Sequence, residues 1–157
     1  MKGVGVIICV SLLLKGATMA YAIDANDLAI VTIWQEARGE SYAGKLAVAQ
    51  VIRNRMLKQY QSDGTVAGTV LRPYQFSGWN TEDGSRVSSA LVDRDKDGYI
   101  HCKEAWFESS STLYPLFPAV LFHSTHMDKF PYWAKAETVD HLMTIGNHAF
   151  YTDEAAE

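Results

Sequence analysis

The chain has 157 residues, enough for one domain with a real core, and its composition of 48% apolar and 20% charged residues is ordinary for a globular protein. The formal net charge is −4, whereas a nucleic-acid partner would require a basic surface to contact phosphates. Composition and charge therefore exclude a typical nucleic-acid-binding protein and leave the other classes open.

The first 22 residues differ from the rest of the chain. A short positive start at Lys2 precedes an apolar run over 4–14, and Ala20-Tyr21-Ala22 has the small-x-small form of a signal-peptidase site. The run is shorter than the roughly 20 residues that cross a bilayer. We expect residues 1–22 to be a secretory signal or a releasable signal-anchor, with a buried N-terminal helix as the alternative. Removal of this segment would take Cys9 away and leave one cysteine, Cys102.

Residues 23–157 are expected to form a single, mainly helical (α+β) domain with little sheet. Apolar spacing predicts a helix over 24–40, capped by Asn26 or Asp27, and a second helix over 44–59. Further along the chain we expect an irregular segment at 64–79, a helical turn at 86–92, a helix at 104–114 anchored by Trp106 and Phe107, a strand or extended segment at 119–123, and a hairpin or loop at 145–151.

Glu36 lies in the largely apolar segment 33–37 of the first predicted helix. Poor solvation raises the pKa of a carboxylic acid, and an acid that is neutral near pH 7 can protonate a leaving oxygen. Glu40 follows four residues later and would face the same side of that helix. The alternative is that both are solvated surface residues, with Glu40 paired to Lys45 or Arg38.

Residues 93–104, DRDKDGYIHCKE, follow the spacing of an EF-hand calcium loop, with Gly98 at the sharp turn. Close carboxylates repel one another unless a cation lies between them, so we expect Ca²⁺ to bind as a structural or activating ion. A solvated acidic turn is the alternative. The predicted ligands are the side chains of Asp93, Asp95 and Asp97, the backbone carbonyl of Tyr99, His101 through water, and Glu104 through both carboxylate oxygens.

Two histidines, His123 and His126, have the H-x-x-H spacing of a zinc pair, but the chain carries no HExxH motif. We therefore expect these side chains to serve as polar groups of a groove or of the packing.

Four blocks of the sequence resemble those of the SleB-like cell-wall hydrolases, a family known from spore cortex-lytic enzymes and related to domains of phage lysins. They are IWQEARGE at 33–40, the G-x-x-A-V-A-x-V-I-x-N-R stretch at 44–55, QFSGW at 75–79 and IGNHAFY at 145–151. The resemblance spans about residues 28–151. It implies a lysozyme-like fold and cleavage of peptidoglycan between N-acetylmuramic acid and N-acetylglucosamine. The calcium loop has no counterpart in the family pattern and resembles an insertion.

The same resemblance assigns the catalytic acid to Glu36, the first glutamate of E-A-R-G-E. It places the QFS block in the groove or its support, and the C-terminal block beside the cleft. Trp79, Tyr132 and Trp133 could stack on sugar rings or belong to the core. The groove candidates are Glu40, Gln75, Phe76, Ser77, Trp79, His123, Asn147, His148 and Tyr151.

A lytic transglycosylase needs one glutamate, whereas a muramidase that uses water normally needs a second carboxylate. The resemblance favours the transglycosylase. Hydrolysis, a non-catalytic calcium-binding wall module and a zinc peptidase are the alternatives. We expect peptidoglycan and calcium as partners, no organic cofactor, and export to the periplasm or cell wall (the host periplasm for a phage lysin), with membrane contact only transient through residues 1–22.

Overall fold

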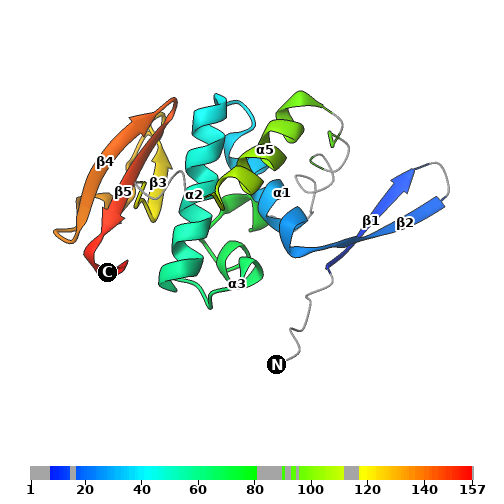
Figure 1. The fold of residues 1–157 in the computed structure, drawn as a ribbon, viewed down its shortest axis with the longest axis horizontal. Coiled ribbons are helices and arrows are strands. Elements are labelled where there is room, and N and C mark those ends of the chain that lie inside the picture. The colour runs from blue at the N-terminus through cyan, green and yellow to red at the C-terminus, as the bar shows by residue number, and fades with distance from the viewer. Residues whose placement is uncertain are drawn as a thin grey trace.

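The computed structural model describes residues 8–14, 17–80, 90, 93, 94, 96–111 and 117–156, and within 8–22 it describes the backbone alone. Most of the helical turn expected at 86–92, the ligand Asp95 and the end of the helix expected at 104–114 lie outside these residues. Over the described part of the chain, a group of packed helices stands beside a small sheet (Figure 1).

The N-terminal segment is an antiparallel hairpin of β1 (Ile8–Leu14) and β2 (Ala17–Ile23), paired from Ile8↔Ile23 to Leu14↔Ala17. It extends away from the helices (Figure 1). The alternative of an N-terminal helix is therefore wrong for these strands, while the signal or signal-anchor stays a prediction. Among the described residues, we find no helix with the length and apolar character needed to cross a bilayer.

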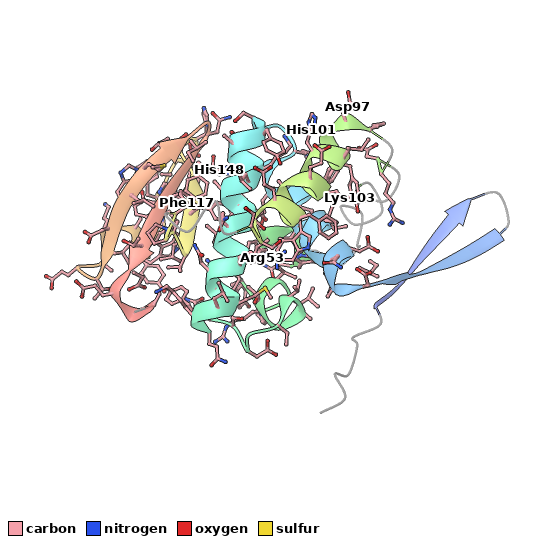
Figure 2. The ribbon with its side chains drawn as sticks, in the orientation of Figure 1. Arg53, Asp97, His101, Lys103, Phe117 and His148 are labelled. Carbon is pink, nitrogen blue, oxygen red and sulfur yellow. The ribbon has the colours of Figure 1, made fainter. Side chains whose placement is uncertain are left out.

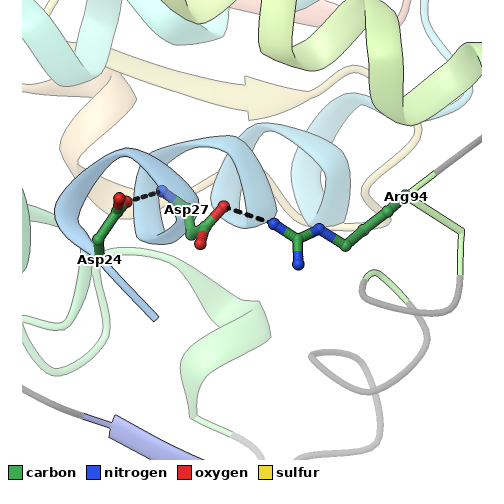
Figure 3. A network of polar contacts seen from close by, with 3 residues as sticks. All are labelled: Asp24, Asp27 and Arg94. Atoms are coloured by element: carbon green, nitrogen blue, oxygen red, sulfur yellow. Dashed lines mark hydrogen bonds and ion pairs between the residues drawn. The ribbon is translucent and has the colours of Figure 1, made fainter. Parts of the chain in front are cut away.

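Helix α1 (Ala25–Ala37) is buried on nearly every face, because α2, α3 and α5 pack around it. Its N-cap is Asp24, not Asn26 or Asp27: Asp24 has an extended backbone, and its Oδ1 accepts from the N–H of Asp27 at 2.8 Å. The Asp27 carboxylate is thereby free to pair with Arg94 at 3.2 Å (Figure 3). The helix ends at Ala37, three residues before the predicted end at Glu40.

Helix α2 (Tyr42–Lys58) starts where the Ser41 side chain accepts from the Gly44 N–H, and it ends at Gln59, whose φ of 52° is left-handed. The prediction of a helix over 44–59 is confirmed. Short helix α3 (Val66–Val70) and the 3-10 turn η1 (Ser77–Trp79) add local order to the segment expected to be irregular.

Helix α5 (Asp97–Glu108) begins seven residues before the predicted start at Glu104. Trp106 anchors it as expected, since its side chain is buried, lies 3.6 Å from the Arg53 guanidinium and donates to Asn26 at 2.9 Å. The expectation for Phe107 was wrong, because half of this side chain is exposed.

The sheet has three antiparallel strands in the order β3-β5-β4 and stands beside α2 (Figure 1). Its strands are β3 (Leu121–Ser124), β4 (Val139–Ile145) and β5 (His148–Asp153), and the 3-10 turns η2 (Tyr132–Lys135) and η3 (Glu154–Ala156) flank them. The expected strand at 119–123 is confirmed as β3. A hairpin at 145–151 is confirmed too, but its first strand begins at Val139. The fold is mainly helical with little sheet, as expected.

Candidate active site

A cavity of about 470 Å³ lies between the helices and the sheet. Glu36, in the last turn of α1, is half-buried and lines it. Pockets of this size that combine polar and apolar walls are typical of small-molecule and substrate sites. Among the described lining residues, Glu36 is the only carboxylate. The predicted acid therefore lies in a groove and not on an open surface.

Arg55, on the last turn of α2, lines the same cavity although it is itself almost fully buried. Its guanidinium donates to the Val120 carbonyl at 2.5 Å and to Gln75 Oε1 at 3.0 Å. Burial lowers the pKa of Arg55 to about 10, and the negative charge of Glu36 acts in the opposite direction. Arg55 is therefore a cation at neutral pH, and its charge favours the ionised form of Glu36. The raised pKa expected for Glu36 stays a prediction.

The QFS block divides between lining and support. Gln75 and Ser77 line the cavity, whereas Phe76 is buried in the core and Trp79 donates to the hydroxyl of Thr32 at 2.9 Å. Phe76 and Trp79 thus fix the backbone of the QFS block to α1. Neither residue is among the described lining residues of the cavity.

Gly78 makes the same attachment possible. A Cβ on this residue would lie 2.2 Å from Oε1 of Gln35, so only glycine lets η1 approach α1 this closely. Gln35, which directly precedes Glu36, therefore sets the position of the cavity wall that η1 carries.

Two histidines of the sheet also line the cavity. Nδ1 of His123 faces the Ser124 carbonyl at 2.8 Å, so this nitrogen carries a proton, and Nε2 forms a hydrogen bond with the Tyr151 hydroxyl at 2.9 Å. His148 lies where the sheet meets α2 (Figure 2). Burial lowers the pKa of His148, an effect opposed by the charge of Glu40. Tyr151 supports His123 from behind and is absent from the described lining.

Glu40 fastens the helices to the sheet and is not among the described lining residues. Its Oε2 accepts from the backbone N–H of Asn147, and its Oε1 accepts from the Asn147 side-chain amide, both at 3.0 Å. The expectation that Glu40 shares a helix face with Glu36 was wrong, because α1 ends before it. Lys45 does contact Glu40, but its ammonium group donates to the backbone carbonyl of Glu40.

Gly146 permits this clasp between Glu40 and Asn147. Its φ of +56° suits glycine, and a Cβ there would lie 2.0 Å from the Glu40 carboxylate. Burial alone would raise the pKa of Glu40, but the hydrogen bonds from Asn147 and the charges of His148 and Lys45 bring it below its ordinary value.

The remaining walls come from loops, and sequence reasoning assigned few of their residues to the site. Tyr74 and Tyr132 line the cavity with 89% and 91% of their surface exposed, whereas Trp133 is half-buried against Tyr151. Asn80 lines it too. The one signal for Arg55 in the sequence is its place in the N-R of the second family block, and its guanidinium donates to oxygens of neutral groups.

The predicted calcium loop has another conformation in the described residues. Residues 97–104 are helical, which directs their carbonyls along the axis of α5, and the Asp93 carboxylate pairs with Lys96 at 2.5 Å. The Tyr99 side chain is buried, and Asp97, His101 and Glu104 are exposed on α5. This arrangement does not fit an EF-hand.

Within the described ranges, no three His, Cys, Asp or Glu side chains gather as metal ligands. His123 is engaged by Ser124 and Tyr151, and His126 is exposed, so the zinc alternative gains no support.

Comparison with known proteins gives consistent results. Residues 39–151 match the Cell Wall Hydrolase family, starting three residues after Glu36. A spore cortex-lytic enzyme of Oceanobacillus iheyensis is 32% identical over 95 residues, covering 59% of this chain and 33% of that protein. One from Bacillus cereus is 26% identical over 138 residues, covering 87% and 48%. The chain thus spans about half or less of the curated relatives that it matches.

Two solved structures share the fold. The catalytic domain of the germination-specific lytic transglycosylase SleB from Bacillus anthracis has a TM-score of 0.59 and 22% identity, covering 89% of this chain and 100% of that one. The catalytic domain of the Bacillus cereus SleB protein has a TM-score of 0.57 and 24% identity, covering 81% and 90%. The expected mainly helical, lysozyme-like fold is confirmed.

Proposed function

Because the chain belongs to the Cell Wall Hydrolase family, we propose that it cleaves peptidoglycan glycan strands between N-acetylmuramic acid and N-acetylglucosamine, as a lytic transglycosylase with Glu36 as its acid. The observation that carries the proposal is the position of Glu36, half-buried in the cavity between the helices and the sheet. General acid catalysis requires a carboxylic acid that a bound sugar can reach but that bulk water does not surround.

A single carboxylate can carry the whole reaction. Neutral Glu36 donates its proton to the glycosidic oxygen, and the bond from C1 of the muramic acid to that oxygen breaks, leaving its electron pair on the oxygen. The Glu36 carboxylate then takes the proton from the C6 hydroxyl of the same muramic acid, whose oxygen bonds to C1. The product is a 1,6-anhydro sugar, and no water is consumed.

Two features of the site support this route over hydrolysis. A muramidase normally places a second carboxylate about 5–9.5 Å from the acid, and Glu36 is the only carboxylate among the described lining residues. Glu40, the nearest candidate in sequence, is engaged by Asn147. The Arg55 cation favours the carboxylate form of Glu36, which serves the second half of this reaction as it would that of a retaining hydrolase.

The other lining residues suit a polar, partly apolar ligand. Gln75, Ser77 and Asn80 offer hydrogen bonds to hydroxyl and acetamido groups, while the sheet adds the imidazoles of His123 and His148. The proposed substrate lies outside the cytoplasmic membrane. The proposal therefore includes export to the periplasm or cell wall, with residues 1–22 as the segment that directs it.

The test is digestion of purified peptidoglycan followed by mass spectrometry of the released muropeptides. Anhydro products, lighter by one water than reducing-end products, support the transglycosylase, and reducing ends would establish hydrolysis in its place. Glu36→Gln should lower release by about a hundredfold or more while the melting temperature is kept. Glu137→Gln, at an exposed residue away from the cavity, is the matched control. Full activity of Glu36→Gln would contradict the assignment.

A further inference from the structure

Tyr74 combines three properties that are rarely found together. It lines the cavity, 89% of its surface is exposed, and its φ of 65° is left-handed. A bulky residue with positive φ is uncommon because its Cβ clashes with the backbone, whereas glycine holds such a turn without strain. The two other non-glycine residues with positive φ in the described chain, Gln59 and Gln61, lie at or just after the end of α2, where this conformation is usual.

The backbone around Tyr74 is fixed without help from its ring. The N–H of Tyr74 donates to Asn80 at 3.3 Å, and the next residue, Gln75, is bound by the buried Arg55. Phe76 follows and is 1% exposed in the core. The ring itself stays in solvent, so neither burial nor packing accounts for a tyrosine at this strained position. Strain of this kind is concentrated at sites that contact ligands.

A second exposed tyrosine borders the same cavity from another segment. Tyr132 opens η2 and is 91% exposed, while the next residue, Trp133, is fixed against Tyr151 with ring centroids 5.5 Å apart. Thus two phenol rings with little protein contact, each next to an anchored residue, border the cavity that contains Glu36. A phenol presents an apolar face and a polar hydroxyl, which matches the C–H faces and hydroxyls of a sugar.

We propose that Tyr74 and Tyr132 are sugar-stacking residues that hold the glycan strand across the cavity, and that the strained turn at Tyr74 is retained because it presents the ring to the substrate. This inference rests on the proposed function and assigns the residues that bind the strand. The expected signature is a gain in stability with a loss in substrate binding when the ring and the strain are removed together.

The experiment compares Tyr74→Gly, Tyr74→Phe and Tyr132→Ala with the wild-type chain. Muropeptide release is measured over a range of peptidoglycan concentrations, and melting temperatures are recorded. Tyr74→Gly should melt at the same or a higher temperature, yet need about three to ten times more peptidoglycan for half-maximal rate, with the maximal rate little changed. Tyr74→Phe, which keeps the ring and loses only the hydroxyl, should show a smaller binding loss than Tyr74→Gly with no gain in melting temperature, and Tyr132→Ala should show the binding loss alone. Phe107→Ala, at a half-exposed aromatic on α5, is the control.

The outcomes separate this inference from the proposed function. Co-sedimentation with insoluble peptidoglycan, carried out in the Glu36→Gln background, measures binding without cleavage. Equal binding by the Glu36→Gln chain with and without Tyr74→Gly would overturn the role of Tyr74, even if the wild-type chain cleaves the wall. A wild-type chain that binds through these tyrosines but releases no muropeptide would refute the enzyme and leave a wall-binding groove. A lower melting temperature of Tyr74→Gly would show that the ring stabilises the fold, against the proposal.

Discussion

The helices and the sheet border one cavity, but they differ in how much of their surface is buried. Nine of the 13 residues of α1 are buried, and the apolar core runs through α1 and α2. In the sheet, β5 is largely buried, whereas β4 is an edge strand with mostly exposed side chains. Most of the hydrophobic stabilisation therefore comes from the helical part, which carries Glu36.

Polar contacts, together with Phe150 of β5, which is buried in the helical core, position the sheet against the helices. Asn54 on α2 donates to the carbonyls of Phe117 and Ala119 at 2.7 and 2.9 Å, and Arg55 donates to that of Val120. The clasp between Glu40 and Asn147 holds the turn between β4 and β5 against the segment that follows α1. Because these contacts place one wall relative to Glu36, we expect their loss to affect activity more strongly than loss of an equal amount of core packing.

The largest loss of stability should come from the helical core. Leu28→Ala removes a side chain that is 1% exposed, and a cavity of this kind costs about 2–5 kcal/mol of unfolding free energy. Met143→Ala, on the exposed edge strand, should cost less than about 0.5 kcal/mol. Urea denaturation measures both. Similar costs for the two variants would contradict the proposed difference between the two regions.

Arg55→Met should lower both stability and activity. The carbonyl of Val120 and the amide oxygen of Gln75 lose a buried charged donor, at a cost of about 3 kcal/mol. The wall near Glu36 also loses its cation. The control is Arg53→Met, because Arg53 contacts Trp106 and Ser109 within the helices. This control should lose stability while muropeptide release per folded molecule is kept, and an equal loss of release would count against our assignment.

Glu40→Gln should lower the free energy of unfolding by about 1 kcal/mol. Muropeptide release should fall by more than the loss of folded protein explains, because the sheet wall is no longer held in place. The pKa of Glu40 is below its ordinary value of 4.5, so its carboxylate stabilises the fold above that pH, and the contribution is lost as the pH falls through the lowered pKa. The difference in melting temperature between wild type and Glu40→Gln should therefore narrow between pH 6 and about pH 3. A constant difference would show that the charge of Glu40 does not hold the clasp.

Calcium should have the smallest effect. Ca²⁺ binding to residues 93–104 stays a prediction, and the helical conformation of 97–104 would have to change for an EF-hand to form. If the folded chain binds the ion, millimolar Ca²⁺ should raise the melting temperature relative to EGTA. Asp93→Asn with Asp97→Asn should abolish that difference. Equal melting temperatures of the wild-type chain with Ca²⁺ and with EGTA would contradict calcium binding by the folded chain.

The helices could be predicted because their sequences repeat apolar residues at helical spacing, as α1 and α2 do. The edge strand β4 was missed since its exposed residues lack the alternation of a half-buried strand. The start of α5 was assigned to a metal loop because acidic residues suit both a calcium site and the first turn of a helix.

The resemblance pointed to Glu36 as the acid, and the groove candidates Gln75, Ser77, His123 and His148 line the cavity, but Tyr74 was not found from the sequence. The turn that carries Tyr74 has no periodicity, and the sequence cannot show that a backbone turns with positive φ at a tyrosine. Glu40 was expected in the groove because four residues make one helical turn. The helix ends at Ala37, and that ending redirects the Glu40 carboxylate to the sheet.

The proposed acid and the anchor of the opposite wall belong to one stretch of five residues, 36–40. An insertion or deletion between them would shift the acid relative to the hairpin turn at Gly146 and would also displace Ala37, which is 1% exposed in the core. The five-residue spacing of E-A-R-G-E therefore ties the position of Glu36 to that of the hairpin turn that Glu40 holds through Asn147.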